Sequence, residues 1–396
     1  MRIDRFKERD ILKQVEPYRE SKEAVIITGM RRTGKTTLLQ YLFETTESEN
    51  KLVLDLENPL NRKYFEEENF DKIQASLEIL GINFSEPSYI FLDEIQLFKN
   101  IPSIVKYFID HFQTKFFLTG STNYYTRKQF EESLAGRKVV FELYPLTFKE
   151  FIKFSGKGLN PPTQKSNISR PIFEKLSTLY DEYIMFGGFP EVVLKQSVTE
   201  KNAALDDIFR SYFNLEVVQM SNYRKSAVIR DLMLLLMNRA GERIDVQNIS
   251  QELGISRATT YSYLEFLEGS YFIKLLKPFN LGSKMEIRKS NKIYVCDVGL
   301  VRHFAHAAED CLFENSVFQN LRTKCDIKYY ERKSGTQIHF ICDDQNKKVA
   351  YDTALHPRKT DLTRLSRIAS EINIDEYSII SKYYCDLEHT IYGFMV

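Results

Sequence analysis

The stretch AVIITGMRRTGKTTLLQYLF, residues 24–43, decides the fold of this protein. It begins with a β-branched run that is typical of a buried strand, and it ends with apolar residues at helical spacing. Between them, residues 29–36 match the pattern G-x-x-x-x-G-K-[ST] in the strand–loop–helix context that this motif requires. The stretch therefore predicts a loop that holds phosphate groups at the N-terminus of a helix.

Each residue type in this loop has a chemical purpose. The glycines let successive backbone N–H groups converge on phosphate oxygens. Lys35 is expected to reach the β- and γ-phosphates, and the Thr36 hydroxyl is expected to ligate Mg²⁺. ATP and Mg²⁺ are thus the predicted cofactors. The predicted nucleotide contacts are Gly29, Arg31, Arg32, Thr33, Gly34, Lys35, Thr36 and Thr37, with the two arginines touching phosphate or a neighbouring acidic group.

An acidic partner for this loop follows the apolar run of residues 88–92. Asp93 ends that predicted strand and is expected to hold Mg²⁺ through its water shell. Glu94 is expected to orient and activate the attacking water. Because open α/β sheets place ligands at the carboxyl ends of their strands, the position fits the chemistry. The consecutive carboxylates favour hydrolysis over phosphoryl transfer to a small molecule.

Three further apolar runs, residues 52–56, 115–121 and 138–143, complete a predicted parallel sheet. Ser121 ends one of them, where its hydroxyl could sense the γ-phosphate. Arg137 precedes the last strand, and two interpretations stay open for it. It neutralises transition-state charge, in its own or a neighbouring subunit, or it forms a surface salt bridge.

Several motifs together resemble a prokaryotic branch of the AAA+ ATPases, near the archaeal-type ATPases and the STAND signal-transducing group. They are GMRRTGKT (29–36), FLDEIQ (91–96), LTGS (118–121), SLAGR (133–137), LYPLTFKEF (143–151), GGFPE (187–191) and YVCDVGL (294–300). The resemblance implies an α/β fold with four parts. These are a P-loop core (1–155), a helical lid with a Gly-Gly-Phe-Pro element (156–225), a winged helix (226–293) and a restriction-nuclease-like C-terminal domain (294–396).

The residues support the third part independently. Three short helical patterns follow residue 228, and a glycine-containing turn at residues 253–256 joins the last two. A basic hairpin comes next, with five Lys or Arg against Glu286 alone. Candidate contacts to duplex DNA are Arg257, Thr259, Thr260 and Tyr263 on the third helix, and Lys284, Arg288, Lys289 and Lys292 on the hairpin. A hinge or protein-facing role, including self-association, is the alternative.

The C-terminal part lacks a complete nuclease site. Restriction-type nucleases need two carboxylates and a lysine on neighbouring strands. Here Gln337 and His339 stand where carboxylates are expected, Ala354 stands in the place of the lysine, and only Asp352 remains. The sequence therefore predicts a nuclease-like domain without nuclease activity.

Composition narrows the remaining classes. A hydrophobic content of 43% is that of a globular chain, and a net charge of +1 excludes a uniformly basic protein. No apolar run approaches the ~18 residues of a transmembrane helix, so no membrane partner is expected. The N-terminus has no signal-peptide character, and the five cysteines are widely spaced. These features favour free thiols in a cytoplasmic protein.

Two functions remain. In the first, the protein is an ATP-hydrolysing molecular switch that couples its nucleotide state to a module engaging DNA or a protein. Lys35, Glu94 and Arg137 are then its catalytic residues, and Thr36 and Asp93 hold Mg²⁺. In the second, it is an adaptor that senses nucleotide without hydrolysing it and without binding DNA.

Overall fold

The computed structural model describes residues 6–121, 134–220, 226–279, 290–332, 334–344 and 347–396. The chain divides into two compact units. The N-terminal unit comprises Met1–Tyr144 with Gly269–Tyr271, and the C-terminal unit comprises Pro145–Glu268 with Phe272–Val396. The second unit holds most of the residues that the sequence assigns to the lid, the winged helix and the C-terminal domain, together with residues 145–155 of the predicted core.

A five-stranded sheet organises the N-terminal unit, in the order β2-β3-β4-β1-β5. All neighbouring strands in it are parallel, so the predicted parallel α/β core is confirmed. The strands are β1 (Ala24–Thr28), β2 (Lys51–Asp55), β3 (Ser88–Asp93), β4 (Thr114–Gly120) and β5 (Lys138–Glu142).

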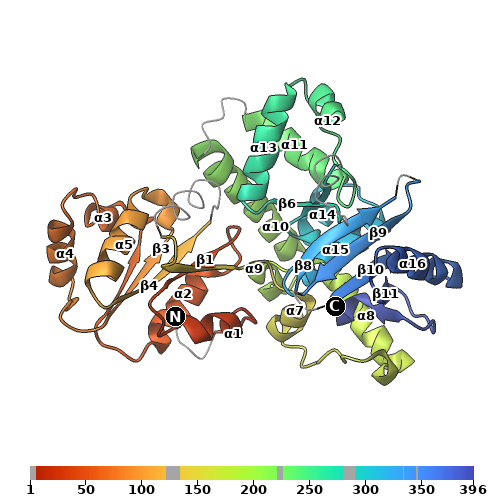
Figure 1. The fold of residues 1–396 in the computed structure, drawn as a ribbon, viewed down its shortest axis with the longest axis horizontal. Helices are drawn as coiled ribbons and strands as arrows, with labels where there is room; N and C mark the ends of the chain where they lie inside the picture. Colours follow the sequence, from red (N-terminus) through yellow and green to blue (C-terminus); the bar gives the residue numbers. More distant parts are fainter. Residues whose placement is uncertain (1–5, 122–133, 221–225, 280–289, 333, 345–346) are drawn as a thin grey trace. The chain divides into compact units, whose positions relative to one another are not determined.

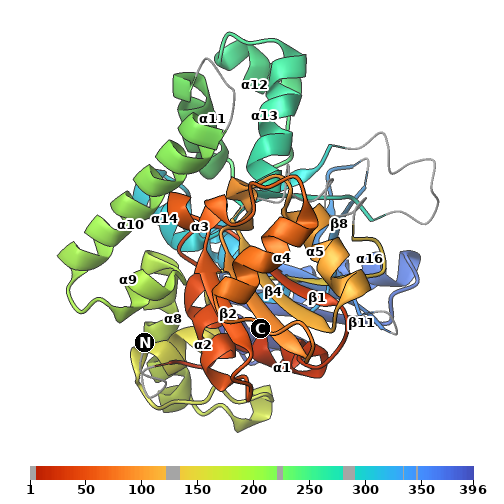
Figure 2. The ribbon, with the colours of Figure 1, turned by 90° about the vertical axis from the view of Figure 1, so that its left-hand side faces the viewer.

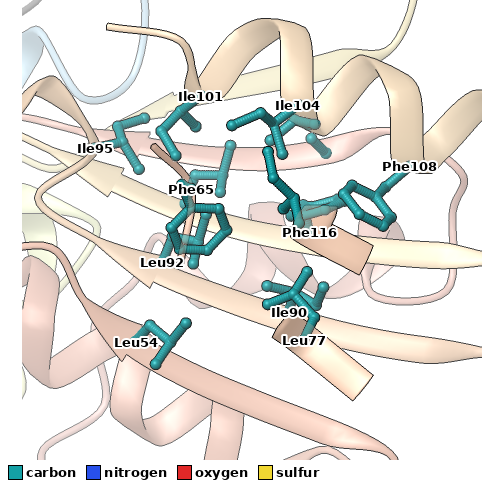
Figure 3. Close-up of a cluster of buried hydrophobic side chains, with 14 of the residues drawn as sticks. Leu54, Phe65, Leu77, Ile90, Leu92, Ile95, Ile101, Ile104, Phe108 and Phe116 are labelled. Atoms are coloured by element: carbon teal, nitrogen blue, oxygen red, sulfur yellow. The ribbon is translucent and has the colours of Figure 1, made fainter. Parts of the chain in front are cut away.

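Helices cover both faces of this sheet, which explains why the central strands read as continuous apolar runs. Side chains alternate between the faces along each strand, so Ile90 and Leu92 meet one helical layer while Phe91 meets the other. Figure 3 shows Ile101, Ile104 and Phe108 of α5 packed over the first of these faces. The helical segments of the unit are α1 (Leu12–Val15), η2 (Glu16–Tyr18), α2 (Lys35–Thr45), α3 (Pro59–Lys63), α4 (Phe70–Ile79), η3 (Ile95–Leu97) and α5 (Ile101–His111).

The C-terminal unit begins with a helical part. Its segments are α7 (Phe148–Ser155), η4 (Lys165–Asn167), α8 (Arg170–Phe186), α9 (Pro190–Leu194), α10 (Val198–Tyr212), the π-helix η5 (Phe213–Met220), α11 (Ser226–Asn238), α12 (Val246–Glu252) and α13 (Arg257–Gly269). Figure 2 shows α11, α12 and α13 gathered together, and the antiparallel pair β6 (Ile273–Leu276) and β7 (Lys292–Val295) follows them along the chain. In the part of the chain that the structure describes, no helix has the length and apolar character needed to cross a bilayer.

A second five-stranded sheet, ordered β12-β11-β10-β9-β8, completes this unit. Strands β8, β9 and β10 pair antiparallel, whereas β10, β11 and β12 pair parallel. Helix α16 crosses between β10 and β11 and packs on the sheet through Leu365 and Ile368 (Figure 1). The elements are α14 (Val298–Phe304), α15 (Glu309–Leu321), β8 (Asp326–Glu331), β9 (Gln337–Asp343), β10 (Lys348–Ala354), α16 (Lys359–Glu371), β11 (Glu376–Ser381), β12 (Thr390–Tyr392) and η7 (Gly393–Met395).

One expectation about the cysteines is wrong. A disulfide links Cys325 and Cys342, whose Cα atoms are 5.5 Å apart, while Cys296, Cys311 and Cys385 are free thiols. The cause is strand register, because antiparallel pairing sets Cys342 opposite Ile327, two residues after Cys325. Spacing along the sequence carries no trace of this pairing.

Candidate functional site

The phosphate-binding loop connects β1 to α2 and depends on glycine at two positions. Gly29 and Gly34 have φ angles of 150° and 97°, which side chains other than hydrogen rarely allow. A Cβ atom at Gly29 would lie 2.2 Å from the carbonyl oxygen of Leu143, which follows β5. Gly29 is therefore needed for the backbone to pass β5 as well as to curl around a ligand.

Lys35 opens α2 and is buried. Its Nζ donates to the carbonyl oxygens of Gly29 at 2.9 Å and Met30 at 3.0 Å, so the ammonium is already aimed along the loop. No side chain of the described residues caps α2, whose N-cap residue is Gly34. The first N–H groups of the helix therefore face the loop as the positive end of the helix dipole, which suits an anion.

Asp93, at the carboxyl end of β3, lies beside the loop. Its carboxylate accepts a hydrogen bond from the Thr119 hydroxyl, and the Thr36 hydroxyl is near enough to lower its pKa. Burial raises the pKa of Asp93 above its usual range, and the two hydroxyls only partly offset this effect. A buried carboxylate beside a threonine hydroxyl is an oxygen donor pair of the type that Mg²⁺ selects, so these residues fit the ion.

Glu94 takes the left-handed conformation, with φ 54° and ψ 46°, which turns the chain sharply out of β3. Its carboxylate is buried beside Arg31 of the loop, with Arg31 Nη2 3.8 Å from Glu94 Oε2. The same oxygen accepts a hydrogen bond from the side-chain amide of Gln96. Arg31 thus meets an acidic group, as the sequence suggested. The role of Gln96 was missed, although it ends the motif FLDEIQ.

A second missed residue anchors the loop from outside. Arg9 is buried, and its guanidinium donates to the carbonyl oxygens of Thr33 at 2.8 Å and Tyr144 at 2.7 Å. It ties the loop backbone to the segment that follows β5. Nothing in the sequence signals this contact, because Arg9 lies outside every recognisable motif.

The remaining predicted nucleotide contacts lie along the same segment. Thr33 is buried and its hydroxyl donates to Met30 at 2.9 Å, whereas Arg32 and Thr36 are exposed and Thr37 is half-buried. Ser121 follows β4, and its hydroxyl oxygen accepts a hydrogen bond from the side-chain amide of Gln96.

Arg137 is not part of this site within its own chain. The strands β1 and β5 are parallel and Ala24 is level with Lys138, so Arg137 lies at the amino end of the sheet, whereas the loop follows the carboxyl end. Its Nε is 2.6 Å from Asp110 Oδ1. The interpretation of Arg137 as a catalytic arginine in cis is therefore wrong, and the salt-bridge interpretation describes the contact that the structure has.

The expected DNA-contacting set is also reduced. Thr260 and Tyr263 are buried within the helices, and Lys292 is 3% exposed with its Nζ 3.2 Å from Glu314 Oε1, so these three predictions are wrong. Lys284, Arg288 and Lys289 lie outside the described residues. Arg257 is exposed at the start of α13, and Tyr261, one turn later on the same face, is 62% exposed. Sequence reasoning passed over Tyr261.

Asp352, the carboxylate that remains from the nuclease pattern, belongs to what we call the carboxylate–cation cluster. Oδ1 of Asp352 pairs with Nδ1 of His339, and Oδ2 lies 2.8 Å from Nη2 of Arg364. The other ring nitrogen of His339 is 3.4 Å from Oε2 of Glu314, whose second oxygen meets Lys292. Both carboxylates are thus paired with side-chain cations, and the donors do not fit a divalent metal ion.

The Gly187–Gly188 element has a structural explanation inside the C-terminal unit. The Asp297 carboxylate accepts hydrogen bonds from the backbone N–H groups of Gly188 at 2.7 Å and Gly299 at 2.9 Å. A Cβ atom on Gly187 would lie 1.8 Å from Asp297 Oδ1. The two motifs GGFPE and YVCDVGL therefore meet each other, a contact that neither motif alone could predict.

Comparison with known proteins agrees with this geometry. Residues 21–152 match a family described as an AAA domain, and residues 177–310 match a domain of unknown function, DUF8612. An uncharacterized protein of Methanocaldococcus jannaschii is 26% identical over 89% of this chain and 80% of its own length. An uncharacterized protein of Haemophilus influenzae is 26% identical over 94% of this chain and 92% of its own length.

Among solved structures, the chain is similar to the Walker-type ATPase of Pyrococcus abyssi. The identity is 15% and the TM-score 0.47, over 76% of this chain and 96% of that one. The family match spans the loop, Asp93 and Glu94, and the parallel sheet has the order described above. Residues 21–152 are therefore an AAA domain, with the phosphate-binding loop and the parallel sheet inside the matched range.

Proposed function

We propose that this protein binds Mg²⁺-ATP at the loop between β1 and α2, hydrolyses it, and uses the nucleotide state as a molecular switch. The observation that carries the proposal is the buried Asp93 carboxylate beside the Thr36 hydroxyl, next to a helix N-terminus that no described side chain caps. Oxygen donors for a hard cation and N–H donors for phosphate thus meet at one place.

The residues have distinct roles in this proposal. Lys35 would contact the β- and γ-phosphates, and Thr36 and Asp93 would hold a magnesium ion, which would supply positive charge against the developing phosphate charge. Glu94 orients the attacking water and accepts its proton. Arg31 supplies a positive charge within the loop, where Arg137 of the same chain cannot.

A second candidate function has a specific observation in its favour. The Glu94 carboxylate is engaged by Arg31 and Gln96, and a carboxylate held in this way does not turn toward an attacking water. A protein locked in this arrangement would bind ATP and hardly hydrolyse it, acting as a nucleotide-sensing adaptor. Turnover of the wild-type chain separates the two functions.

The experiment compares the wild type with Lys35→Ala for ATP binding by calorimetry and for phosphate release. We expect wild-type binding with turnover, and loss of both in the variant, because the buried ammonium is the main charge facing the phosphates. Lys72→Ala, on the exposed surface of α4, is the matched control and should behave as wild type. Binding that survives in Lys35→Ala would contradict the proposal, and binding without turnover in the wild type would favour the adaptor.

The output of the switch is proposed to be contact with duplex DNA or with a protein through α13. Arg257 and Tyr261 present a charge and an aromatic ring on one exposed face, although the helices carry no basic excess. We would titrate the protein with duplex DNA over a salt series, because each phosphate contact adds about 0.9 to the salt slope. Arg257→Ala should lower the slope, whereas Arg230→Ala on exposed α11 should not. Absence of any salt-dependent binding would leave the protein-partner alternative.

A further inference from the structure

The side chain of Gln96 makes hydrogen bonds to two residues of the proposed ATP site, Glu94 and Ser121. Gln96 Nε2 donates to the Ser121 hydroxyl oxygen at 2.7 Å, and Gln96 Oε1 accepts from the Ser121 backbone N–H at 3.2 Å. The same Nε2 donates to Oε2 of Glu94. Both ends of one amide are therefore used, and each of its bonds leads to Glu94 or to Ser121.

The local backbone is shaped to bring this amide into place. The left-handed turn at Glu94 is followed by η3, a short segment that carries Gln96 from the end of β3 toward the end of the neighbouring strand β4. At that end, a Cβ atom on Gly120 would lie 3.1 Å from Gln96 Oε1. A larger residue at position 120 would press on the amide, so the glycine preserves the contact with Ser121.

We propose that Gln96 is a positioning residue, which ties Glu94 to Ser121 so that the γ-phosphate state read at Ser121 sets the orientation of the Glu94 carboxylate. The inference rests on the proposed ATP hydrolysis. Gln96 touches neither phosphate nor water in this account and acts through Glu94. Arg31 shares Oε2 of Glu94 with the amide, so a shift of the amide changes how strongly Arg31 holds the base.

Substituting the amide by an isosteric carboxylate tests this proposal most sharply. In Gln96→Glu, the acceptor oxygen for the Ser121 N–H remains, but the donor to Glu94 becomes a second negative charge. The two like charges repel each other, so the Glu94 carboxylate is pushed out of the orientation in which the amide holds it. We expect kcat to fall by at least about tenfold, with ATP affinity within about twofold of wild type.

Gln96→Ala removes both bonds without adding charge. We expect about a tenfold fall in kcat, again with ATP affinity nearly unchanged, and this fall should vanish when Glu94→Gln is already present, because the amide acts only through that side chain. The matched control is Gln74→Glu on α4, whose amide makes a similar bond to Glu78, at 2.8 Å, on the exposed surface. It should leave kcat and ATP affinity unchanged.

The outcomes separate cleanly. A wild-type kcat in Gln96→Glu, or a fall in Gln96→Ala that persists in the Glu94→Gln background, overturns the positioning role while leaving ATP hydrolysis intact. A wild-type chain that shows no turnover overturns the proposed function and this inference together.

Discussion

Two buried aspartates, Asp93 in the N-terminal unit and Asp352 in the C-terminal unit, differ in their partners. Asp93 accepts a hydrogen bond from the Thr119 hydroxyl and has the Thr36 hydroxyl beside it, and burial raises its pKa. Burial also opposes ionisation of Asp352, but the charges of His339 and Arg364 outweigh it and lower the pKa of Asp352. The hydroxyls beside Asp93 are neutral and do not balance its negative charge. The cationic side chains beside Asp352 do balance the negative charge of that carboxylate.

The difference shows what separates a carboxylate that can serve a metal ion from one that holds a fold together. A Mg²⁺ ion beside Asp93 would supply the positive charge that this buried group lacks. At Asp352 the same charge is already present in side chains, so a divalent ion would have to displace them. The cluster around Asp352 therefore has its charges paired internally.

The largest expected effect comes from replacing Asp93. Asp93→Asn should lower Mg²⁺-dependent ATP turnover on the order of 100-fold, because several kcal/mol of charge stabilisation by the metal is lost. Asp352→Asn should leave turnover within about twofold, as measured by phosphate release. A similar loss of turnover in both variants would break the comparison.

Asp352→Asn should instead destabilise the C-terminal unit. Removing one partner of a buried charge cluster leaves the others uncompensated, which costs about 3 kcal/mol in the free energy of unfolding. The control is Asp343→Asn, at an exposed pair with Lys348 whose N–O distance is 3.7 Å, and it should cost no more than about 0.5 kcal/mol. Equal costs in denaturant titration would show that the cluster is not a structural element.

The cluster also makes stability depend on pH in a defined direction. Burial disfavours the charged imidazole, but the carboxylates of Glu314 and Asp352 outweigh it and raise the pKa of His339. Its stabilisation is therefore complete below about pH 6.5, the unfolded value, and is lost as pH rises through the folded pKa. The pKa of Asp352 is lowered, so the stabilisation from this carboxylate is complete above about pH 4, the unfolded value. That stabilisation is lost as pH falls through the folded pKa.

Hydrogen exchange of the β9 and β10 amides measures this dependence locally. Protection should be greatest between about pH 4 and 6.5 after correction for intrinsic exchange, and it should decline at higher pH. In His339→Gln the decline above pH 6.5 should disappear, whereas the exposed-surface variant His111→Gln should keep it. Protection that rises steadily with pH would contradict the assigned direction.

The smallest effect is expected at Arg137. Arg137→Ala loses a half-exposed salt bridge with Asp110, so turnover at low protein concentration should stay within about twofold. Repeating the measurement at increasing protein concentration sharpens the result. A defect that grows as chains associate would indicate that Arg137 acts on a neighbouring subunit.

The sequence predicted the sheet and the loop of the N-terminal unit well, because the motifs there are local. Residues 24–36 carry strand, loop and helix in one continuous stretch, and the five predicted strands match the sheet closely. Contacts made across the fold were not predictable in this way. Arg9 reaches the loop from 24 positions away, and the disulfide depends on the register between β8 and β9.

The wrong functional assignments depend on strand direction and burial, which residue type and spacing do not show. Arg137 was judged by its distance from a strand along the chain, but the direction of that strand puts it at the wrong end of the sheet. The predicted DNA contacts rest on residue type alone for Lys292, Thr260 and Tyr263, but these side chains are buried. Residue type and spacing predict which chemistry a side chain can perform. Its exposure and the direction of its strand decide whether the side chain reaches a ligand.

The most direct test of the account is ATP turnover by Glu94→Gln at saturating Mg²⁺-ATP, measured together with its affinity for ATP. The substitution keeps the size of the side chain and removes the proton acceptor. The account predicts wild-type affinity and a rate lower on the order of 100-fold. Wild-type turnover in this variant would contradict the assignment of hydrolysis to the site at the end of β3.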